Sequence, residues 1–308
     1  MAGLFAGKGA IVGALLAAVA VIVVGESGAS AATTGTWNVV QSPNKSTTAF
    51  DGFAGVTCVT PSDCWAVGSY FDGNSEQTLV EHWDGTSWSI VSSPNQVPGP
   101  GAGTEESNAL NSVSCVSSSD CWAVGFYVRT VQTPTAPQNT PVTSNDEPLY
   151  EHWDGSNWAL VTPVIVGTTD YQLFGVSCSS SSTCHAVGYW EPTASSPEVF
   201  TSTWNGTTWA GDTQTTAGEL RGVSCVDASH CWGVGLDASS TSATLVEMWN
   251  GTSWVVQSSP NQGTDSNFLE GVSCISPTDC WAVGLYVDDA GGNKTQDLFE
   301  LWNGTTWS

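Results

Sequence analysis

Residues 269–284 read LEGVSCISPTDCWAVG, and the chain carries this stretch five times with small changes. The other four copies begin at Phe53, Leu110, Leu173 and Leu220. A second motif of the form WDGTSW or WNGTTW follows each copy and begins at Trp83, Trp153, Trp204, Trp249 and Trp302. Self-similarity at a period of this kind indicates a repeat architecture.

Each repeat divides into four short runs rich in Val, Trp, Thr and Tyr, which favour β-strands. In the first repeat these runs cover residues 53–59, 64–70, 77–83 and 87–91. No stretch after the first 31 residues has a sustained helical period. Four antiparallel strands in a unit of about 50 residues are typical of one propeller blade. We therefore expect an all-β fold, a five-bladed β-propeller with four antiparallel strands per blade.

The connections inside the repeats are of two kinds. The first loop always holds five residues between two cysteines, and the third is always Asp-Gly or Asn-Gly, which favours a two-residue hairpin. The other connections vary in length and composition, as in residues 94–107 and 129–148. Alternate turns of an up-and-down sheet lie at opposite ends of the strands. The sequence therefore predicts a constant face, formed by the uniform turns, and a variable face, formed by the others.

The two ends of the chain predict how the ring closes. Residues 36–43, TWNVVQSP, have the pattern of a fourth strand with no third strand before them, whereas the last repeat reaches its fourth strand only at Trp307. If Trp37 is equivalent to Trp307, the N-terminal strand completes the last blade and leaves no exposed sheet edge. A truncated longer array is the alternative.

The first 31 residues differ from the rest. Lys8 precedes an uncharged apolar run over residues 9–24, and Ala29, Ser30 and Ala31 follow as a cleavage site. This is the three-part layout of a secretory signal peptide. An uncleaved membrane anchor is the alternative, because the run approaches the ~20 residues of a spanning helix. We expect residues 32–308 to form the propeller, secreted to the extracellular space and free of the membrane after cleavage.

The ten cysteines fall into five pairs with five residues between partners. In an exported chain, an even count at a fixed spacing indicates disulfides. A structural zinc site is disfavoured because its cysteines are usually closer in sequence and the four histidines are not placed as partners. The predicted disulfides are Cys58–Cys64, Cys115–Cys121, Cys178–Cys184, Cys225–Cys231 and Cys274–Cys280.

The sixteen tryptophans follow the repeat with one exception. Large rings at fixed blade positions fill the wedge between neighbouring sheets, so we expect them to pack between blades. Trp190 lies outside the pattern, beside Tyr189 on the variable face, and is a candidate ligand-binding residue.

The chain has 5 basic and 29 acidic residues and a formal net charge of −24. Such a surface repels phosphate backbones and anionic lipids, which excludes nucleic acid as a partner. The acidic residues form no long run, which favours a solubilising role, and we expect a monomer. We expect no cofactor. Calcium is the alternative, with Asp72, Glu76, Asp288 and Asp289 as candidates, although none belongs to a strict calcium motif.

The motifs CWAVG at Cys64 and HWDGTSW at His82 resemble those of kelch and galactose-oxidase-like propellers, and the resemblance extends from Trp37 to Ser308. Within these bounds the repeats are also similar to those of secreted bacterial proteins of the GVSC…DCWAVG…WNGTSW type. This chain has one glycine at the end of the second strand where kelch repeats usually have two, and the cysteine pair of the first loop is not a general kelch feature. The resemblance implies a propeller fold.

Two chemistries of propeller enzymes are disfavoured. Galactose oxidase uses a copper site with a free cysteine, whereas every cysteine here has a predicted partner and His82 is replaced in later repeats. Sialidases clamp a carboxylate with three arginines, whereas this chain has only Arg129 and Arg221. Carboxylate pairs for glycoside hydrolysis carry no motif, so they remain open.

One inner-strand position differs in every repeat. The residues there are Ala54, Asn111, Phe174, Arg221 and Glu270, so a constant frame presents five different side chains. They either fill the channel mouth or form a ligand site. The candidate binding residues are Asn111, Phe174, Trp190, Arg221 and Glu270.

The sequence thus favours a secreted, non-enzymatic propeller that binds an extracellular glycan or protein through its variable loop face. A glycoside-active enzyme with carboxylates in the central funnel is the alternative, and an envelope-structural domain is a third. Five dissimilar loops favour one composite site over five identical sugar sites.

Overall fold

The structure is a computed structural model, and the part that it describes is all β. The described residues are 38–46, 50–96, 107–131, 143–162, 170–192, 196–239, 243–263, 265–288 and 294–308. They form strands β1–β18 and no helix. None of these residues belongs to a helix long and apolar enough to cross a membrane. The predicted signal peptide, residues 1–31, lies outside the described residues.

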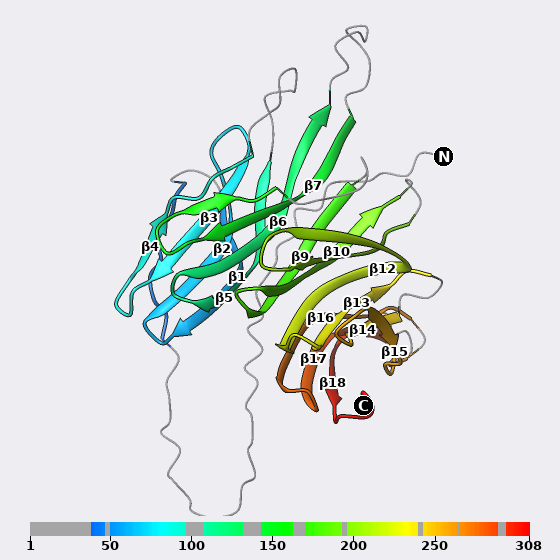
Figure 1. Cartoon of the computed structure of the whole chain (residues 1–308). Helices are drawn as coiled ribbons and strands as arrows, with labels where there is room; N and C mark the ends of the chain where they lie inside the picture. Colours follow the sequence, from blue (N-terminus) through cyan, green and yellow to red (C-terminus); the bar gives the residue numbers. More distant parts are fainter. Residues whose placement is uncertain are drawn as a thin grey trace, which may run out of the picture. The chain divides into compact units, whose positions relative to one another are not determined.

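The first two repeats each form a four-stranded antiparallel sheet, with the strands in chain order (Figure 1). Repeat 1 contains β1 Asp51–Thr60, β2 Asp63–Phe71, β3 Glu76–Trp83 and β4 Trp88–Val91. Repeat 2 contains β5 Asn108–Ser117, β6 Asp120–Val131, β7 Thr143–Trp153 and β8 Trp158–Leu160. These sheets match the predicted blade.

Repeats 3 and 4 share one seven-stranded sheet, which differs from the expectation of separate blades. Its strands are β9 Asp170–Ser180, β10 Thr183–Glu191, β11 Glu198–Trp204, β12 Trp209–Asp227, β13 His230–Asp237, β14 Ala243–Trp249 and β15 Trp254–Gln257. The first half of β12 pairs with β11 and the second half with β13. The connection between these repeats is short and contains no proline, so nothing interrupts the strand.

Repeat 5 has three strands, β16 Asn267–Ser276, β17 Asp279–Asp288 and β18 Lys294–Trp302. An isolated bridge between Trp302 and Trp307 begins a fourth strand. Residues 38–46 form no strand, and Ser42 Oγ donates a hydrogen bond to Glu81 Oε2 of repeat 1 at 2.7 Å. The described residues therefore show no closed ring, and neither closure by the N-terminal strand nor the five-bladed count is confirmed.

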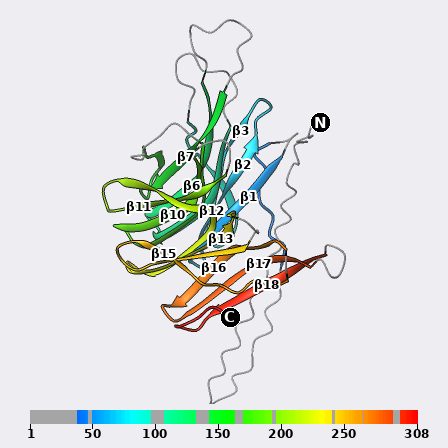
Figure 2. The same ribbon diagram turned by 90° about the vertical axis from the view of Figure 1, so that its right-hand side faces the viewer.

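The first strands of successive repeats lie side by side in the order β1, β5, β9, β12 and β16 (Figure 1). All of them except β12 are edge strands of their sheets. Figure 2 shows β1, β12 and β16 from the side. The first strands approach closely where the repeat has a small residue. An ideal Cβ on Gly55 would lie 3.0 Å from the Cα of Ser112, and one on Gly222 would lie 2.9 Å from the Cα of Gly271. Small residues at this position therefore let the inner strands of neighbouring repeats approach.

Tryptophans pack in the interfaces between the sheets of neighbouring repeats, as predicted. We call each of these interfaces a joint. The ring of Trp122 in repeat 2 lies 4.6 Å from that of Trp204 and 5.2 Å from that of Trp209 in repeat 3, between ring centroids. Trp65 contacts repeat 2 and Trp232 contacts repeat 5 in the same way. The same joints bury the apolar residues of the two facing sheets. Each joint therefore combines one residue of a repeat with the hairpin of the next.

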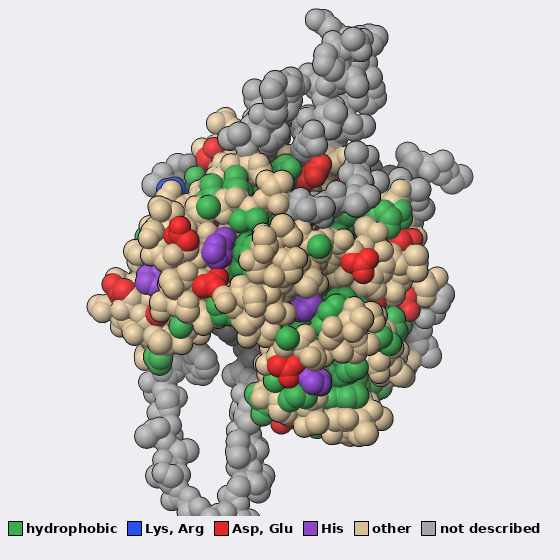
Figure 3. Space-filling view, viewed as in Figure 1, with side chains coloured by type: hydrophobic (Ala, Val, Ile, Leu, Met, Phe, Trp, Pro, Cys, Tyr) green, Lys and Arg blue, Asp and Glu red, His purple; other side chains and the backbone are tan. Residues whose placement is uncertain are grey.

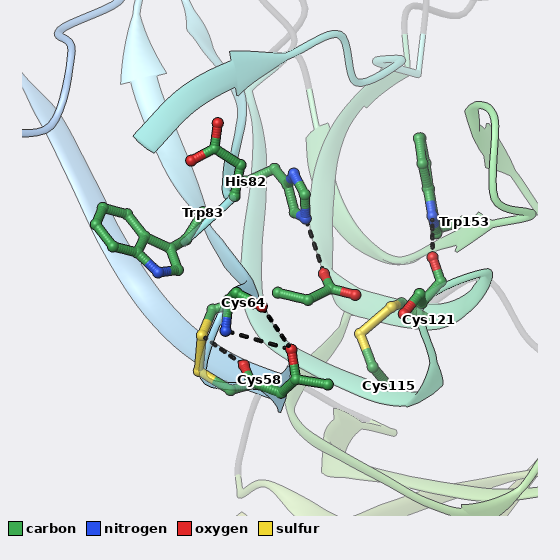
Figure 4. A network of polar contacts seen from close by, with 12 residues as sticks. Cys58, Cys64, His82, Trp83, Cys115, Cys121 and Trp153 are labelled. Atoms are coloured by element: carbon green, nitrogen blue, oxygen red, sulfur yellow. Dashed lines mark hydrogen bonds and ion pairs between the residues drawn. A yellow bond between two sulfur atoms is a disulfide. The ribbon is translucent and has the colours of Figure 1, made fainter. Parts of the chain in front are cut away.

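The five predicted disulfides are all present, and no cysteine is free. In every repeat the tryptophan before the Asp/Asn-Gly turn donates a hydrogen bond from Nε1 to a carbonyl of the disulfide loop. Figure 4 shows this bond for Trp153 in repeat 2. The donor–acceptor pairs are Trp83–Pro61, Trp153–Ser118, Trp204–Ser181, Trp249–Ala228 and Trp302–Pro277. The disulfide loop and the Asp/Asn-Gly turn thus lie together at one end of the strands in each repeat, in agreement with the predicted constant face.

Candidate functional site

Each repeat has a β-bulge in its first strand. The register between the first and second strands shifts at two points, one next to the disulfide loop and one farther from it. At the point farther from the loop, one residue of the first strand has no partner. The unpaired residues are Ala54, Asn111, Phe174, Arg221 and Glu270. These are the five positions that differ between repeats. A bulge re-aims a side chain out of the regular pleat, and bulges are frequent next to functional sites.

The last glycine of the CWAVG motif accompanies this bulge. An ideal Cβ on Gly188 would lie 1.8 Å from the carbonyl oxygen of Gln172, and one on Gly125 would lie 2.0 Å from that of Ala109. The first-strand carbonyl therefore lies so close to the second strand that only glycine fits at the last position of the CWAVG motif. The bulge is thus formed by the backbone and does not depend on the side chain of the bulged residue.

Arg221 lies at the joint of repeats 4 and 5 and contacts two carboxylates. One Arg221 terminal nitrogen lies 2.7 Å from Glu219 Oε1, and the other pairs with Glu270 Oε1. The guanidinium carbon also lies 5.4 Å from the ring centre of Phe268. Burial opposes the charge, but the two glutamates outweigh it and raise the pKa of Arg221. Arg221 is thus a fixed, permanently charged group that joins β12 to β16.

Phe174 and Tyr189 lie beside this ion-pair network. Their ring centroids are 5.7 Å apart. Burial raises the pKa of Tyr189, and so do the carboxylates of Asp146, Glu191, Glu219 and Asp170. The Tyr189 hydroxyl is therefore a neutral donor in a negatively charged environment.

Asp146 and Asn111 extend the site toward repeat 2. Gln172 Nε2 donates a hydrogen bond to Asp146, and burial, with a contribution from Asp170, raises the pKa of Asp146. Asn111 Nδ2 donates to the carbonyl oxygen of Leu173 at 2.7 Å. We call the whole group the central cluster, and its members are Asn111, Asp146, Gln172, Phe174, Tyr189, Glu219, Arg221 and Glu270.

The structure places four of the five predicted binding residues in two contacts between neighbouring repeats. Arg221 and Glu270 form an ion pair, and Asn111 contacts the backbone next to Phe174. Trp190 is separate: its ring stacks on Tyr171 at 6.1 Å, and its Nε1 donates to the Gln214 carbonyl at 3.4 Å. Successive residues of a strand point to opposite faces, so Trp190 and Tyr189 cannot line the same surface.

Sequence reasoning missed three residues that lie two positions before the bulge residues: Gln172, Glu219 and Phe268. Residues i and i+2 of a strand share a face, and this period could have identified them. Asp146 lies on β7 at the end of a variable loop and carries no such signal.

A second set of carboxylates belongs to the joints. Glu81, Glu151, Glu247 and Glu300 occupy one position of the third strand and are at most 1% exposed. Burial raises the pKa of Glu151 to about 8 and that of Glu247 and Glu300 to about 7. Serines of the preceding repeat donate to Glu151 and Glu300. Because these glutamates are closed between sheets, we interpret their shifted pKa values as structural.

The central cluster contains aromatic rings, an amide, carboxylates and one cation, a combination that can bind sugar hydroxyls or a polar peptide. Figure 3 shows other acidic side chains dispersed over one face of the molecule. Within the described residues no group of three or more His, Cys, Asp or Glu is arranged to hold a metal ion. Of the four calcium candidates, Asp289 lies outside the described residues, and calcium binding stays a prediction.

No protein-family model and no curated protein sequence matches this chain. Among solved structures it is similar to an ulvan lyase of polysaccharide lyase family PL25, with 9% identity and a TM-score of 0.51 over 81% of this chain and 64% of that one. It is also similar to a protein of unknown function from Dyadobacter fermentans, with 10% identity and a TM-score of 0.50 over 80% and 74% of the two chains. A SapL1 lectin in complex with alpha methyl fucoside has 12% identity and a TM-score of 0.45 over 82% and 77%. At these identities the likeness shows the fold alone, which is β-propeller-like.

Proposed function

We propose that this protein is a secreted, non-enzymatic binding propeller that recognises an extracellular glycan or protein through its variable loop face, with the central cluster as its site. One observation carries the proposal: every repeat has an unpaired residue at the same point of its first strand, yet these five residues differ. Between neighbouring repeats, Arg221 pairs with Glu270, and Asn111 contacts the backbone next to Phe174. A purely structural position would repeat its side chain, as the joint tryptophans nearly do.

The chemistry of the chain supports an extracellular setting. Five disulfides are typical of an oxidising compartment. The net charge of −24 is unfavourable for nucleic acid and for anionic surfaces. The binding partner is therefore a neutral or cationic molecule of the cell exterior, and the protein acts as a monomer.

The proposed active form is a closed five-bladed ring. One feature that supports closure is that Trp281 of repeat 5 is 42% exposed, whereas the equivalent Trp122 of repeat 2 is 2% exposed. In addition, Ser42 donates to Glu81 as Ser93 of repeat 1 donates to Glu151 of repeat 2. Residue 42 thus occupies the place of the end of a fourth strand in a repeat that would precede repeat 1.

A glycan-array assay on the disulfide-intact protein, with and without calcium, tests the function. We expect binding that Arg221→Ala and Glu270→Ala weaken and that Ile275→Ala, which removes a 73% exposed side chain from the disulfide loop of repeat 5, leaves unchanged. A protein partner instead of a glycan would show as a silent array together with capture of a defined extracellular protein that Arg221→Ala abolishes. Binding that is insensitive to both cluster variants would contradict the site.

A glycan-active enzyme is the second candidate, favoured by one observation. Asp146 has a raised pKa beside a second carboxylate, Asp170, which is the pairing that acid–base chemistry on a glycosidic bond uses. Any glycan that binds should then be incubated and examined for product. Turnover that Asp146→Asn abolishes would establish the enzyme and displace the binding proposal.

A further inference from the structure

A pocket at the joint of repeats 1 and 2 is separate from the central cluster. It is open, has a volume of about 440 Å³, and is lined by Phe50, Phe71, Asn74, Ser75, Glu76 and Ser107. Phe50 is 63% exposed and Phe71 is 38% exposed. We propose that this pocket binds one neutral hexopyranose unit.

The two phenylalanines are not part of the repeat. The Phe71 backbone N–H donates to the Phe50 carbonyl at 2.9 Å, and Val128 donates to Ser107 in the same way in repeat 2 at 2.8 Å. Repeat 5 has the corresponding bond from Val287 to Ser266. The backbone bond therefore recurs with serine and valine, and the fold has no need of an aromatic pair at this point.

The Phe50 ring packs against Gly52, whose lack of a side chain leaves room for it. An ideal Cβ on Gly52 would lie 2.5 Å from the tip of the Phe50 ring, so the ring covers the bare Cα of this glycine. The equivalent residues of the other repeats are Ala109, Gln172, Glu219 and Phe268. Repeat 1 alone thus combines a glycine with an aromatic ring above it, and this fixes the orientation of one wall of the pocket.

The opposite wall is a rigid turn. Asp72 Oδ1 accepts the backbone N–H groups of Asn74 and Ser75 at 2.8 and 3.0 Å, and Gly73 has φ of 107°. These hydrogen bonds lower the pKa of Asp72 and keep it ionised. The turn therefore fixes the backbone of Asn74 and Ser75, which line the pocket.

Polar groups at the base of the pocket are already oriented. Gln77 Nε2 donates to Ser75 Oγ at 2.8 Å, which leaves the Ser75 hydroxyl hydrogen available as a donor. Ser69 Oγ donates to Glu76 Oε1, which leaves Oε2 as an acceptor. Pre-set polar groups reduce the entropic cost of binding a small, hydroxyl-rich ligand.

This combination matches a sugar ring. Aromatic faces contact the apolar C–H face of a pyranose, and a carboxylate, an amide and hydroxyls bind its hydroxyl groups. The volume lies in the range of small-molecule sites. Glu76 and the strongly acidic chain disfavour uronates and sulfated sugars, so the occupant is neutral.

Saturation-transfer NMR on the full, disulfide-intact chain tests the assignment. The neutral probes are the methyl α-pyranosides of glucose, galactose and mannose, and the anionic probe is methyl glucuronide. We expect saturation of at least one neutral probe and none of the glucuronide. Phe71→Ala and Phe50→Ala should each raise the Kd about tenfold or more, which corresponds to ~1.4 kcal/mol.

Two further variants distinguish the sites. Gly52→Val keeps both phenylalanines but displaces the Phe50 ring, so it should weaken binding without removing an aromatic group. Ile275→Ala, which removes a 73% exposed apolar side chain from the disulfide loop of repeat 5, is the control, and it should bind as the parent does. Near-ultraviolet circular dichroism and the thermal midpoint show whether each variant keeps its fold.

Three outcomes would overturn the proposal: no neutral probe saturates, the glucuronide binds as well as the neutral sugars, or Phe50→Ala and Phe71→Ala bind like the parent. If Arg221→Ala abolishes binding and Phe71→Ala does not, the sugar lies at the central cluster. That result would refute this pocket and leave the proposed function standing.

Discussion

Trp122 and Trp281 occupy the same position in repeats 2 and 5, but their environments differ. Trp122 is 2% exposed because Trp204 and Trp209 of repeat 3 close over it. Trp281 is 42% exposed, since the described residues provide no following repeat. The difference shows that a joint belongs to two repeats at once. One repeat contributes the central ring, and the next contributes the hairpin that covers it.

The joint of repeats 3 and 4 has a different centre. His185 replaces the tryptophan there and lies between Trp249 and Trp254, with ring centroids 4.7 and 5.6 Å away. His185 Nδ1 is 3.2 Å from Thr203 Oγ1, and its Nε2 is buried without a partner. The same hairpin therefore covers an indole in three joints and an imidazole in one.

The largest expected effect is the loss of a covered tryptophan. Trp122→Ala should lower the free energy of unfolding by about 3–5 kcal/mol, because it removes a buried ring and leaves a cavity. If the ring closes as proposed, Trp281→Ala should cost nearly as much. Chemical denaturation of both variants measures the two values. A cost below ~1 kcal/mol for Trp281→Ala would show that this face stays open in solution.

The second prediction concerns the buried glutamates and pH. Glu151 has a folded-state pKa of about 8, above its ordinary value of 4.5, so its neutral form is favoured in the folded protein. Folding is therefore penalised as the pH rises from about 4.5 to about 8, and the penalty is constant above that range. Glu247 and Glu300 add to it up to a pH of about 7.

Glu151→Gln should remove part of this dependence and stabilise the protein at pH 8 by on the order of 2–4 kcal/mol relative to its effect at pH 5. Thermal unfolding of the variant and the parent across this range measures the difference. Asp265→Asn, an exposed change, is the control. Parallel pH profiles for Glu151→Gln and the parent would contradict a buried, neutral Glu151.

The third prediction concerns the replacement of His185 by tryptophan, the residue at this position in the other joints. Burial lowers the pKa of His185 to about 4, so the neutral form is favoured in the fold, and stability is lost as the pH falls from about 6.5 toward 4. His185→Trp should add about 1 kcal/mol at pH 7 through apolar burial and more at pH 5, where it also removes the titration. Unfolding midpoints at both pH values test this. A loss of stability at pH 5 would mean that the joint has no room for the indole.

The smallest expected effect concerns one hydrogen bond between repeats. Ser93 Oγ donates to Glu151 Oε2 at 2.7 Å and lies 2.9 Å from Thr78 Oγ1. Ser93→Ala should cost about 1 kcal/mol, and less when combined with Glu151→Ala. A double-mutant cycle gives the coupling. Strict additivity of the two substitutions would show that the bond does not join the repeats.

Much of the fold could be predicted from local spacing. The disulfides and the joint tryptophans depend on residues at a constant distance within one repeat, and both were found as expected. The Asp/Asn-Gly turns join the predicted strands, but they are not the expected two-residue hairpins: four residues separate the paired Trp83 and Trp88, and Asp84 Oδ1 accepts the N–H groups of Thr86 and Ser87. The continuous strand β12 was not predicted, because the sequence pattern marks where a strand can end but not whether it must. Repeat 3 also has Ser202 where other repeats have the buried glutamate.

The candidate site was predicted only in part. The variable inner-strand position was visible in the sequence because the repeat supplies its own comparison, and Asn111, Phe174, Arg221 and Glu270 were found there. The sequence alone determined the repeat, its staples and its joint residues, since these depend on contacts inside one unit or between identical units. Only the tertiary structure decided that a bulge exposes the variable residues, that Asp146 and Tyr189 join them, and that Phe50 lies over Gly52. Those relations depend on register and on which neighbouring strand lies alongside, and a spacing within the sequence contains neither.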